Sequence, residues 1–135
     1  MRTILKISDA AVIALHAVDL MGANPRRPRS AAGIAGELGV SYNHLSKIMQ
    51  RLTKAGFVAP IRGPKGGFAL TARAGGASLR EIIEAIEGPL AFTDCLMETK
   101  ICGRSACLFS DFLKDANERL LKMLSQKVSV FAKTR

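Results

Sequence analysis

Residues 41–71 read SYNHLSKIMQRLTKAGFVAPIRGPKGGFALT, and this stretch is the most informative about the fold. Ser41 is a favourable N-cap for an amphipathic helix that runs to about Ala55, where Gly56 closes it. Two short segments with strand character follow, on either side of the glycine-rich turn 63–67. This order predicts a helix followed by a β-hairpin with a basic, glycine-rich tip. The expected strands cover residues 57–61 and 68–71.

Two further helical patterns precede this stretch. Apolar residues at helical spacing predict a helix from Ser8 to Met21, which a segment containing glycine and proline then ends. Ser30 can cap a second helix that ends near Leu38, and a glycine separates this helix from the one beginning at Ser41. Two helices joined by a short glycine turn and followed by a basic hairpin are typical of a winged helix-turn-helix.

The C-terminal half continues with two helical patterns around a loop. The capping box 78–81 opens a short helix, and a loop over residues 90–107 follows. From Leu108 to about Phe131, apolar residues recur every three or four positions. Such a helix would be roughly 35 Å long at 1.5 Å per residue, too long for a small core to cover, so we expect a dimerisation arm. The fold class is therefore mainly α with a small β-hairpin: a winged helix-turn-helix plus a long C-terminal dimerisation helix. The residues expected to bury against the partner chain are Phe109, Phe112, Leu120, Leu124 and Val128.

The basic charge is concentrated in the first half of the chain. The formal net charge is +9. Residues 1–75 hold 11 Lys and Arg against 3 Asp and Glu, a net of +8, whereas residues 76–135 hold 9 against 8, a net of +1. A small basic domain usually binds a polyanion. We therefore expect a DNA-binding region in residues 1–75, with the cysteine loop and the dimerisation helix in residues 76–135. A solvated basic face without a ligand is the alternative.

The composition excludes several classes of protein. Hydrophobic residues make up 48% and charged residues 23% of the chain, which is typical of a globular domain and not of a disordered one. No uncharged apolar run approaches the ~20 residues that span a bilayer, so no membrane association is expected. Asp9, His16 and Asp19 mark the apolar segment 10–18 as a buried helix face and not as a signal peptide. We expect a cytoplasmic protein with reduced cysteines.

The expected DNA contacts lie on the polar face of the 41–55 helix and at the hairpin tip. Asn43 can read adenine in the major groove, and Lys47 or Gln50 can reach bases or phosphates. Arg62 and Lys65 can enter the minor groove or neutralise phosphates. The alternatives are a packed helix pair with a tight turn, and a nucleoid protein that binds DNA without sequence choice. The complete expected set is Tyr42, Asn43, His44, Ser46, Lys47, Gln50, Arg62 and Lys65.

Cys95, Cys102 and Cys107 lie within thirteen residues in the spacing C-x6-C-x4-C. Three thiolates so close in sequence favour a soft metal or an iron–sulfur cluster. A structural zinc site normally needs a fourth Cys or His nearby. His16 and His44 are the only histidines, and both lie far away in the sequence. A cluster with one unusual ligand is therefore the preferred hypothesis, and three reduced cysteines without a special role are the alternative.

Three segments resemble the bacterial winged-helix iron–sulfur regulators: RGPKGGF at 62–68, SLREIIEAIEGPL at 78–90, and Asp94-Cys95. This family includes the iron–sulfur biogenesis repressor IscR, the nitric-oxide sensor NsrR and the cluster-free cysteine-metabolism repressor CymR. The resemblance covers nearly the whole chain. It implies a homodimer whose long last helices cross, with each cluster loop near the partner's first helix. The implied cofactor is an iron–sulfur cluster of the 4Fe–4S or 2Fe–2S type.

The match to the nitric-oxide sensor branch is somewhat closer. Residues 41–48, SYNHLSKI, resemble its recognition helix, and residues 7–9, Ile-Ser-Asp, resemble a segment whose aspartate ligates the cluster of the other subunit. The resemblance thus implies that Asp9 completes a metal site formed by the three cysteines. An aspartate that only favours the helix dipole is the alternative. The cysteine spacing departs from the family's commoner x5–x5 form, and no histidine follows Cys107 as it does in the biogenesis branch.

The sequence predicts a dimeric transcription regulator, a repressor, that binds a pseudo-palindromic operator in double-stranded DNA. Its DNA affinity would depend on an iron–sulfur cluster that senses nitric oxide, redox state or cluster supply. A cluster-free regulator that senses through its thiols or through a protein partner is the alternative. An enzyme is not expected, because a Cys nucleophile needs a base beside it and neither His16 nor His44 is well placed.

Overall fold

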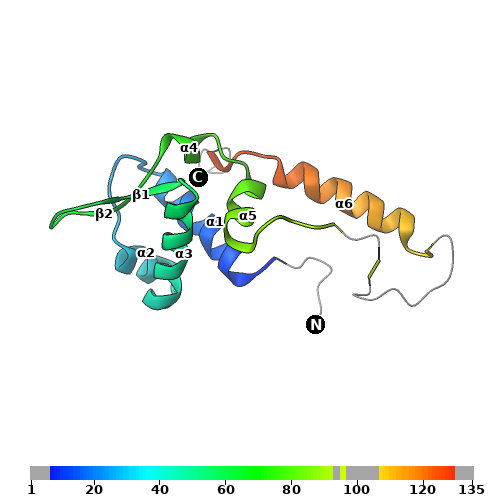
Figure 1. The fold of residues 1–135 in the computed structure, drawn as a ribbon, viewed down its shortest axis with the longest axis horizontal. Coiled ribbons are helices and arrows are strands. Elements are labelled where there is room, and N and C mark those ends of the chain that lie inside the picture. Colours follow the sequence, from blue (N-terminus) through cyan, green and yellow to red (C-terminus); the bar gives the residue numbers. More distant parts are fainter. Residues whose placement is uncertain (1–6, 93–94, 97–106, 130–135) are drawn as a thin grey trace.

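The computed structural model describes residues 7–92, 95–96 and 107–129. Helices dominate the chain, and a single hairpin interrupts them between α3 and α4 (Figure 1). This confirms a mainly α fold with a winged helix-turn-helix. The short helix α4 was not predicted, because four residues carry no readable periodicity. In chain order the elements are α1 (Asp9–Gly22), α2 (Ala31–Leu38), α3 (Tyr42–Lys54), β1 (Val58–Ile61), β2 (Gly67–Leu70), α4 (Ala72–Gly75), α5 (Leu79–Glu87) and α6 (Ser110–Leu124).

The core forms around α1, which packs against α2, α3 and α5 (Figure 1). Three small residues of α1, Ala11, Ala14 and Ala17, have no exposed surface. Small side chains on a contact face let the axes of neighbouring helices approach closely. Across the contact, Ile82 and Ile83 of α5 are fully buried as well. The recognition helix candidate α3 and the helix that precedes the cysteine loop therefore share one core.

Serine side chains cap the main helices at the positions that the sequence predicts. The hydroxyls of Ser8, Ser30 and Ser41 each accept a backbone N–H from the first turn of the helix that follows. Ser78 begins α5 in a capping box with the glutamate three residues later. Between α2 and α3, Gly39 has a φ of 67°, a left-handed conformation that favours glycine. The predicted helix starts are thus confirmed.

The hairpin is anchored to the segment between α1 and α2. β1 and β2 pair antiparallel with Ile61 opposite Gly67, so β2 begins one residue earlier than the sequence predicts. Arg29 and Phe68 exchange two backbone hydrogen bonds of 2.8 Å each, which adds a third segment to the edge of the hairpin. The backbone of this segment lies directly against Gly67. The wing is therefore not an isolated hairpin, which would be only marginally stable.

Gly67 is expected to resist substitution at this contact. Its φ is +150°, and a Cβ atom would stand 2.4 Å from the carbonyl oxygen of Arg29. Gly67→Ala should therefore lower the free energy of unfolding by at least about 1 kcal/mol, measured by urea denaturation. Gly36→Ala is the matched control, because a Cβ there meets nothing within 4 Å and alanine is favoured in a helix by about 1 kcal/mol. If both substitutions had the same effect, the close backbone contact would be contradicted.

The last helix is shorter than predicted. α6 ends at Leu124 and not near Phe131, which lies outside the described residues. After α6 the chain turns back onto the start of α5, where Ser78 and Lys127 form an antiparallel bridge. The 15 residues of α6 span about 22 Å at 1.5 Å per residue. The apolar spacing continues past this point because the side chains still face a core, although the backbone is no longer one helix.

Two residues predicted to face a partner subunit lie in the core of their own chain. Leu124 is 4% exposed and Val128 is 5% exposed, and both belong to the main hydrophobic core. The backbone N–H of Val128 donates to the carbonyl of Ala77 over 3.0 Å, which holds the segment after α6 in place. Leu120 is partly buried against the same core. The prediction of an intersubunit role is therefore wrong for Leu124 and Val128.

Candidate nucleic-acid interface and cysteine loop

One face of α3 packs into the core, and the opposite face carries exposed polar groups. The buried face holds Leu45, Ile48, Met49 and Leu52, in agreement with the predicted periodicity. The other face begins at the N-terminal end of the helix, where recognition helices contact base edges. Ser46 is half-buried on this helix. The remaining predicted contact residues of α3 are all exposed: Tyr42, Asn43, His44, Lys47 and Gln50.

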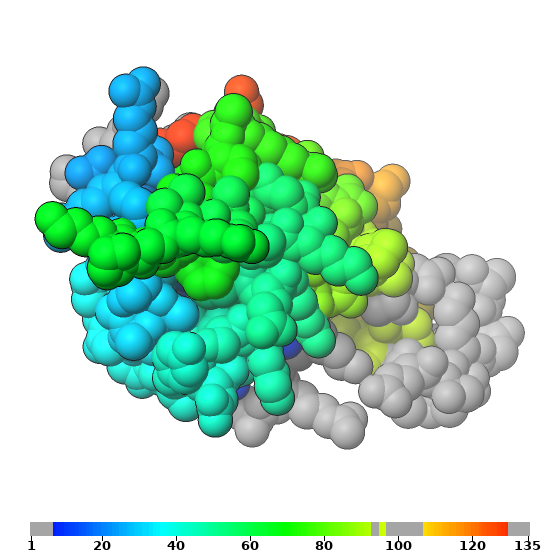
Figure 2. Space-filling model, turned by 60° about the vertical axis from the view of Figure 1, so that its left-hand side comes forward, coloured from blue at the N-terminus to red at the C-terminus, as the bar shows by residue number. Residues whose placement is uncertain are grey.

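The hairpin tip presents two cations on a tight glycine turn. Arg62 and Lys65 are exposed, as predicted. The Gly66 N–H donates to the Gly63 carbonyl over 2.9 Å, and a Cβ atom on Gly66 would collide with the carbonyl oxygen of Ile61 at 2.1 Å. The glycines therefore bring the backbone together below the two charged side chains. Figure 2 shows the hairpin in green and α3 in blue-green on one face of the molecule.

An arginine links α3 to the end of α5. The guanidinium of Arg51 donates a hydrogen bond of 2.8 Å to the carbonyl oxygen of Ile86, in the last turn of α5. Carbonyls in the last turn of a helix lack helical partners, and a cation is favoured there. This role of Arg51 leaves no signal in the sequence, because the pattern of α3 shows only that the residue is polar. This contact joins the candidate recognition helix to the helix that leads into the cysteine loop.

Two glutamate side chains of α5 form hydrogen bonds near the start of the cysteine loop. Glu84 accepts hydrogen bonds from the Arg80 guanidinium at 2.8 Å and from the Leu90 amide at 3.2 Å. The Arg80 hydrogen bond, followed by that of Leu90, lowers the pKa of Glu84 from its ordinary value of 4.5. The carboxylate is therefore charged at neutral pH, and these contacts are lost only when the pH falls through the lowered pKa. Glu87 accepts the backbone N–H of Ser8, which joins the start of α1 to the end of α5.

The structure describes two of the three cysteines. Cys95 and Cys107 are half-buried, and the Phe109 N–H donates to the Cys107 sulfur over 3.4 Å. Cys102 and Asp94 lie outside the described residues. Within the described ranges, no group of three His, Cys, Asp or Glu side chains gathers in a metal-binding arrangement. The donor chemistry of the thiols suits a soft metal, whereas a complete ligand set is not assembled by the described residues of one chain.

Asp9 occupies the first turn of α1. Its side chain is exposed, next to the Ser8 N-cap. A negative charge at this position favours the positive end of the helix dipole. Because the Ser8 amide contacts Glu87, Asp9 lies at the same end of the molecule as the exit from α5. This placement leaves its carboxylate accessible to a ligand from outside its own chain.

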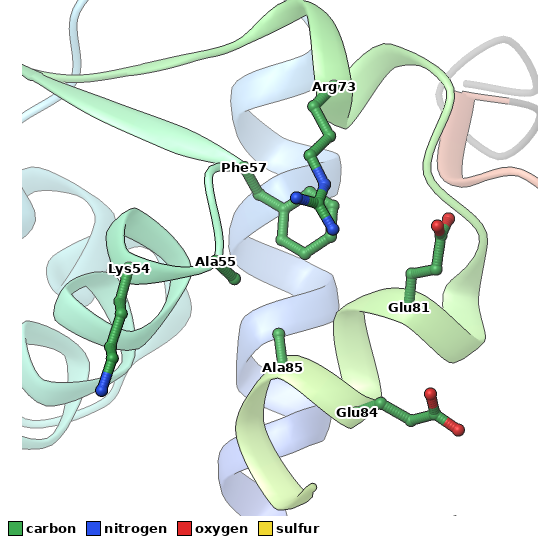
Figure 3. Close-up of a pocket in the computed structure, with 7 residues that line it drawn as sticks. All are labelled: Lys54, Ala55, Phe57, Arg73, Glu81, Glu84 and Ala85. Atoms are coloured by element: carbon green, nitrogen blue, oxygen red, sulfur yellow. The ribbon is translucent and has the colours of Figure 1, made fainter. Parts of the chain in front are cut away.

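An open hollow lies between the end of α3 and α5 (Figure 3). The guanidinium of Arg73 stacks over the ring of Phe57 at 4.8 Å from the ring centroid. The charged side chains on the rim do not converge: Lys54 and Glu84 point away from each other in Figure 3. Binding pockets for small molecules normally hold a few polar groups directed at the ligand. We therefore assign no ligand to this hollow.

α6 carries an apolar stripe that its own chain leaves uncovered. Phe109, at its N-cap, is 51% exposed, Phe112 is 55% exposed and Met123 is 45% exposed. The helix extends away from the other elements in Figure 1, so its N-terminal half stands outside the core. Several large exposed apolar side chains on one helix are typical of an interaction site. Within the residues that the structure describes, no helix has the length and hydrophobicity needed to cross a membrane.

Known proteins of similar sequence are transcription regulators. The HTH-type transcriptional regulator IscR of Klebsiella pneumoniae is 33% identical over 98 residues, covering 73% of this chain and 60% of the relative. The regulator of the same name from Vibrio atlanticus is 29% identical over 113 residues, covering 84% of this chain and 61% of the relative. The chain thus spans about three fifths of the length of these curated relatives.

Solved structures share the fold over almost the whole chain. CymR, the global cysteine regulator of Bacillus subtilis, has a TM-score of 0.72 and 25% identity, covering 97% of this chain and 98% of its own. IscR of T. potens has a TM-score of 0.72 and 21% identity, covering 97% and 89%. The sequence profile of one family, Rrf2, described as iron-dependent transcriptional regulators, matches residues 7–129. Because this match spans every element of the fold, the chain belongs to the Rrf2 family of transcriptional regulators.

Proposed function

We propose that this protein is a dimeric repressor that binds double-stranded DNA and whose DNA affinity is set by an iron–sulfur cluster. The observation that carries the proposal is the direct contact between α3, which belongs to the expected DNA-binding face, and α5, which leads into the cysteine loop. The polar face of α3 and the hairpin tip lie on one face, and Arg51 joins α3 to the Ile86 carbonyl at the end of α5. The cysteine loop begins directly after α5. A change in the conformation of that loop would therefore alter the position of α5 and, through the Arg51 contact, the position of α3.

The DNA contacts are assigned to residues 1–75 by charge and exposure. The N-terminal end of α3 would enter the major groove, where Asn43 reads a base and Lys47 binds a phosphate. The hairpin tip, with Arg62 and Lys65, would contact the adjacent minor groove or its phosphates. A two-fold dimer requires two such half-sites, which makes the operator pseudo-palindromic.

Lys47→Ala and Asn43→Ala are expected to weaken DNA binding in different ways. Because both subunits lose one phosphate contact, Lys47→Ala should weaken operator and unrelated DNA equally and reduce the slope of log affinity against log salt by about 1.8. Loss of a base contact in Asn43→Ala should weaken the operator alone, by about 5- to 150-fold for each half-site, and leave the salt slope unchanged. Fluorescence anisotropy with labelled duplexes at several salt concentrations measures both effects.

Lys54→Ala is the matched control for this pair. Lys54 is exposed on the same helix but lies at its C-terminal end, away from the end that reads bases. It should leave affinity and salt slope unchanged. If Lys47→Ala behaved like Lys54→Ala, the placement of α3 in the groove would be wrong.

Three cysteines and one carboxylate are the proposed ligands of the cluster: Cys95, Cys102, Cys107 and, from the other subunit, Asp9. Thiolates provide the soft ligands that an iron–sulfur cluster prefers. A carboxylate is a weaker ligand, and a weakly held iron is the position that a diatomic molecule such as nitric oxide would reach first. The resemblance of residues 7–9 and 41–48 to the nitric-oxide sensor branch supports this signal, with redox state and cluster supply as the other candidates.

A cluster-free regulator is the second candidate function. The similarity to the global cysteine regulator of Bacillus subtilis supports it. Such a protein would respond to oxidation of its thiols or to a protein partner. Purification without oxygen separates the two candidates, because a brown protein with iron–sulfur charge-transfer absorption supports the cluster and a colourless protein supports the thiols.

A further inference from the structure

The turn between α1 and α2 carries two exposed arginines that none of the assignments above uses. Arg26 and Arg27 lie between Pro25 and Pro28, in a segment that the sequence analysis treated only as a helix end. Both side chains are exposed. In the described part of the chain, neither side chain takes part in a hydrogen bond or an ion pair. Two adjacent cations with no internal partner are a candidate site for an anionic ligand.

The structure holds this turn in a defined position. The backbone N–H of Arg27 donates to the Asn24 carbonyl over 3.1 Å, which closes a turn with proline at its second position. Two residues later, Arg29 exchanges two backbone hydrogen bonds of 2.8 Å each with Phe68 of β2. The side chain of Arg29 is occupied as well, because it forms an ion pair with Glu37 of α2. The arginine nearest the hairpin therefore fixes the segment, and the other two remain available.

The available arginines lie on the same side of the molecule as the wing. Gly67 permits this arrangement, since a Cβ atom there would overlap the Arg29 backbone. Figure 2 shows the blue segment between α1 and α2 projecting beside the green hairpin, on the face that also carries α3. The elements on this face carry three groups of exposed cations: Lys47 on α3, Arg62 and Lys65 on the wing, and the arginine pair of the turn. A duplex that contacts the first two groups presents a continuous line of phosphates to the third.

We propose that Arg26 and Arg27 form a second phosphate-binding arm beside the wing, which contacts the sugar–phosphate backbone of the bound duplex. The inference rests on the proposed DNA binding and deepens it. The arm reads no bases, because its position is set by backbone pairing with the wing and its charges are those that phosphates attract without regard to sequence. Its contribution is affinity that salt weakens, added equally to operator and unrelated DNA.

The double variant Arg26→Ala/Arg27→Ala tests this arm. Loss of two phosphate contacts in each subunit of the dimer should reduce the salt slope by about 3.6 and weaken binding by about 100-fold or more near 0.1 M salt. The preference for operator over unrelated DNA and the thermal unfolding temperature should stay unchanged. The charge-matched control is Lys114→Ala/Lys122→Ala on α6, which removes two exposed cations away from this face and should leave the slope unaltered.

The double variant Arg26→Lys/Arg27→Lys shows whether the positive charge or the packing of the two arginines is responsible for the effect. Arg26→Lys/Arg27→Lys should restore most of the affinity, since lysine binds a phosphate as a point charge. An unchanged salt slope in the alanine variant, while the wild type binds DNA with its normal salt dependence, would overturn the arm and leave the proposed function intact. If the wild-type protein bound no duplex at all, the proposed function itself would fail, and with it the arm.

Discussion

Phe112→Glu is expected to convert the protein to a monomer and to weaken operator binding by about 1,000-fold or more. Phe109, Phe112 and Met123 are large apolar side chains of α6 and its N-cap that the chain itself leaves exposed. In the proposed dimer these side chains pack against the same side chains of the second chain. A glutamate there would be buried without a partner, which costs on the order of several kcal/mol.

Loss of the dimer removes half of the DNA contacts at once. Each monomer then binds one half-site, and its affinity falls towards that of unspecific binding. Sedimentation velocity should show the smaller species, and anisotropy with the operator duplex should show the weaker binding. The circular dichroism of the variant should remain that of a folded helical protein, because Phe112 lies outside the main core.

Lys114→Glu is the control for this prediction. Two residues along a helix correspond to about 200°, so Lys114 lies almost opposite Phe112 on α6. The substitution changes the net charge more strongly, in the same direction, on an exposed side chain. It should leave the protein dimeric. A dimer that survives Phe112→Glu would show that the subunits associate through another surface.

Cys107→Ala is expected to abolish the iron–sulfur absorption of protein purified without oxygen. Cys107 is one of three thiolate ligands in the proposed site, and two thiolates cannot hold a cluster of either proposed type with full occupancy. The variant should also lose the dependence of DNA affinity on the cluster, which we expect to be about 5- to 150-fold in the wild type. Equal DNA affinity of cluster-loaded and cluster-free wild type would contradict the switch, even if the cluster were present.

Asp9→Ala is expected to have a smaller effect on the cluster than Cys107→Ala. If Asp9 is the fourth ligand, this variant should still assemble a cluster on three thiolates, with an altered spectrum, a shorter lifetime and altered reactivity with nitric oxide. A cluster identical to that of the wild type in all three respects would leave Asp9 as a residue that only favours the α1 dipole. Its effect on folding should be small, because its side chain is exposed.

The local features of this chain can be predicted from short stretches of sequence. Ser41 and Ser78 cap helices through their own side chains, and Gly39 permits the left-handed turn between α2 and α3. Each signal depends on residues within a few positions of one another. For the same reason the exposed polar face of α3 and the basic hairpin tip could be predicted, since periodicity and turn residues determine them together.

Contacts between distant segments could not be predicted in this way. Arg51 reaches the Ile86 carbonyl, and Arg29 pairs with Phe68, across separations that leave no local pattern. The cysteine loop is a mixed case. The clustering of its thiols is visible in the sequence, whereas the proposed metal site would also need Cys102 and a residue of a second chain, and both lie beyond the described residues.

The order of helices and hairpin, their caps, and the concentration of basic charge in residues 1–75 can all be predicted from the amino-acid sequence. The end of α6, and the surface to which each of its apolar residues belongs, depend on how the chain packs in three dimensions. Leu124 is buried in the core of its own chain, while Phe112 is exposed on the same helix. Both positions fit one apolar periodicity, because spacing records only that a side chain avoids water. Whether its own core or a second subunit covers that side chain depends on how far the helix extends beyond the rest of the fold.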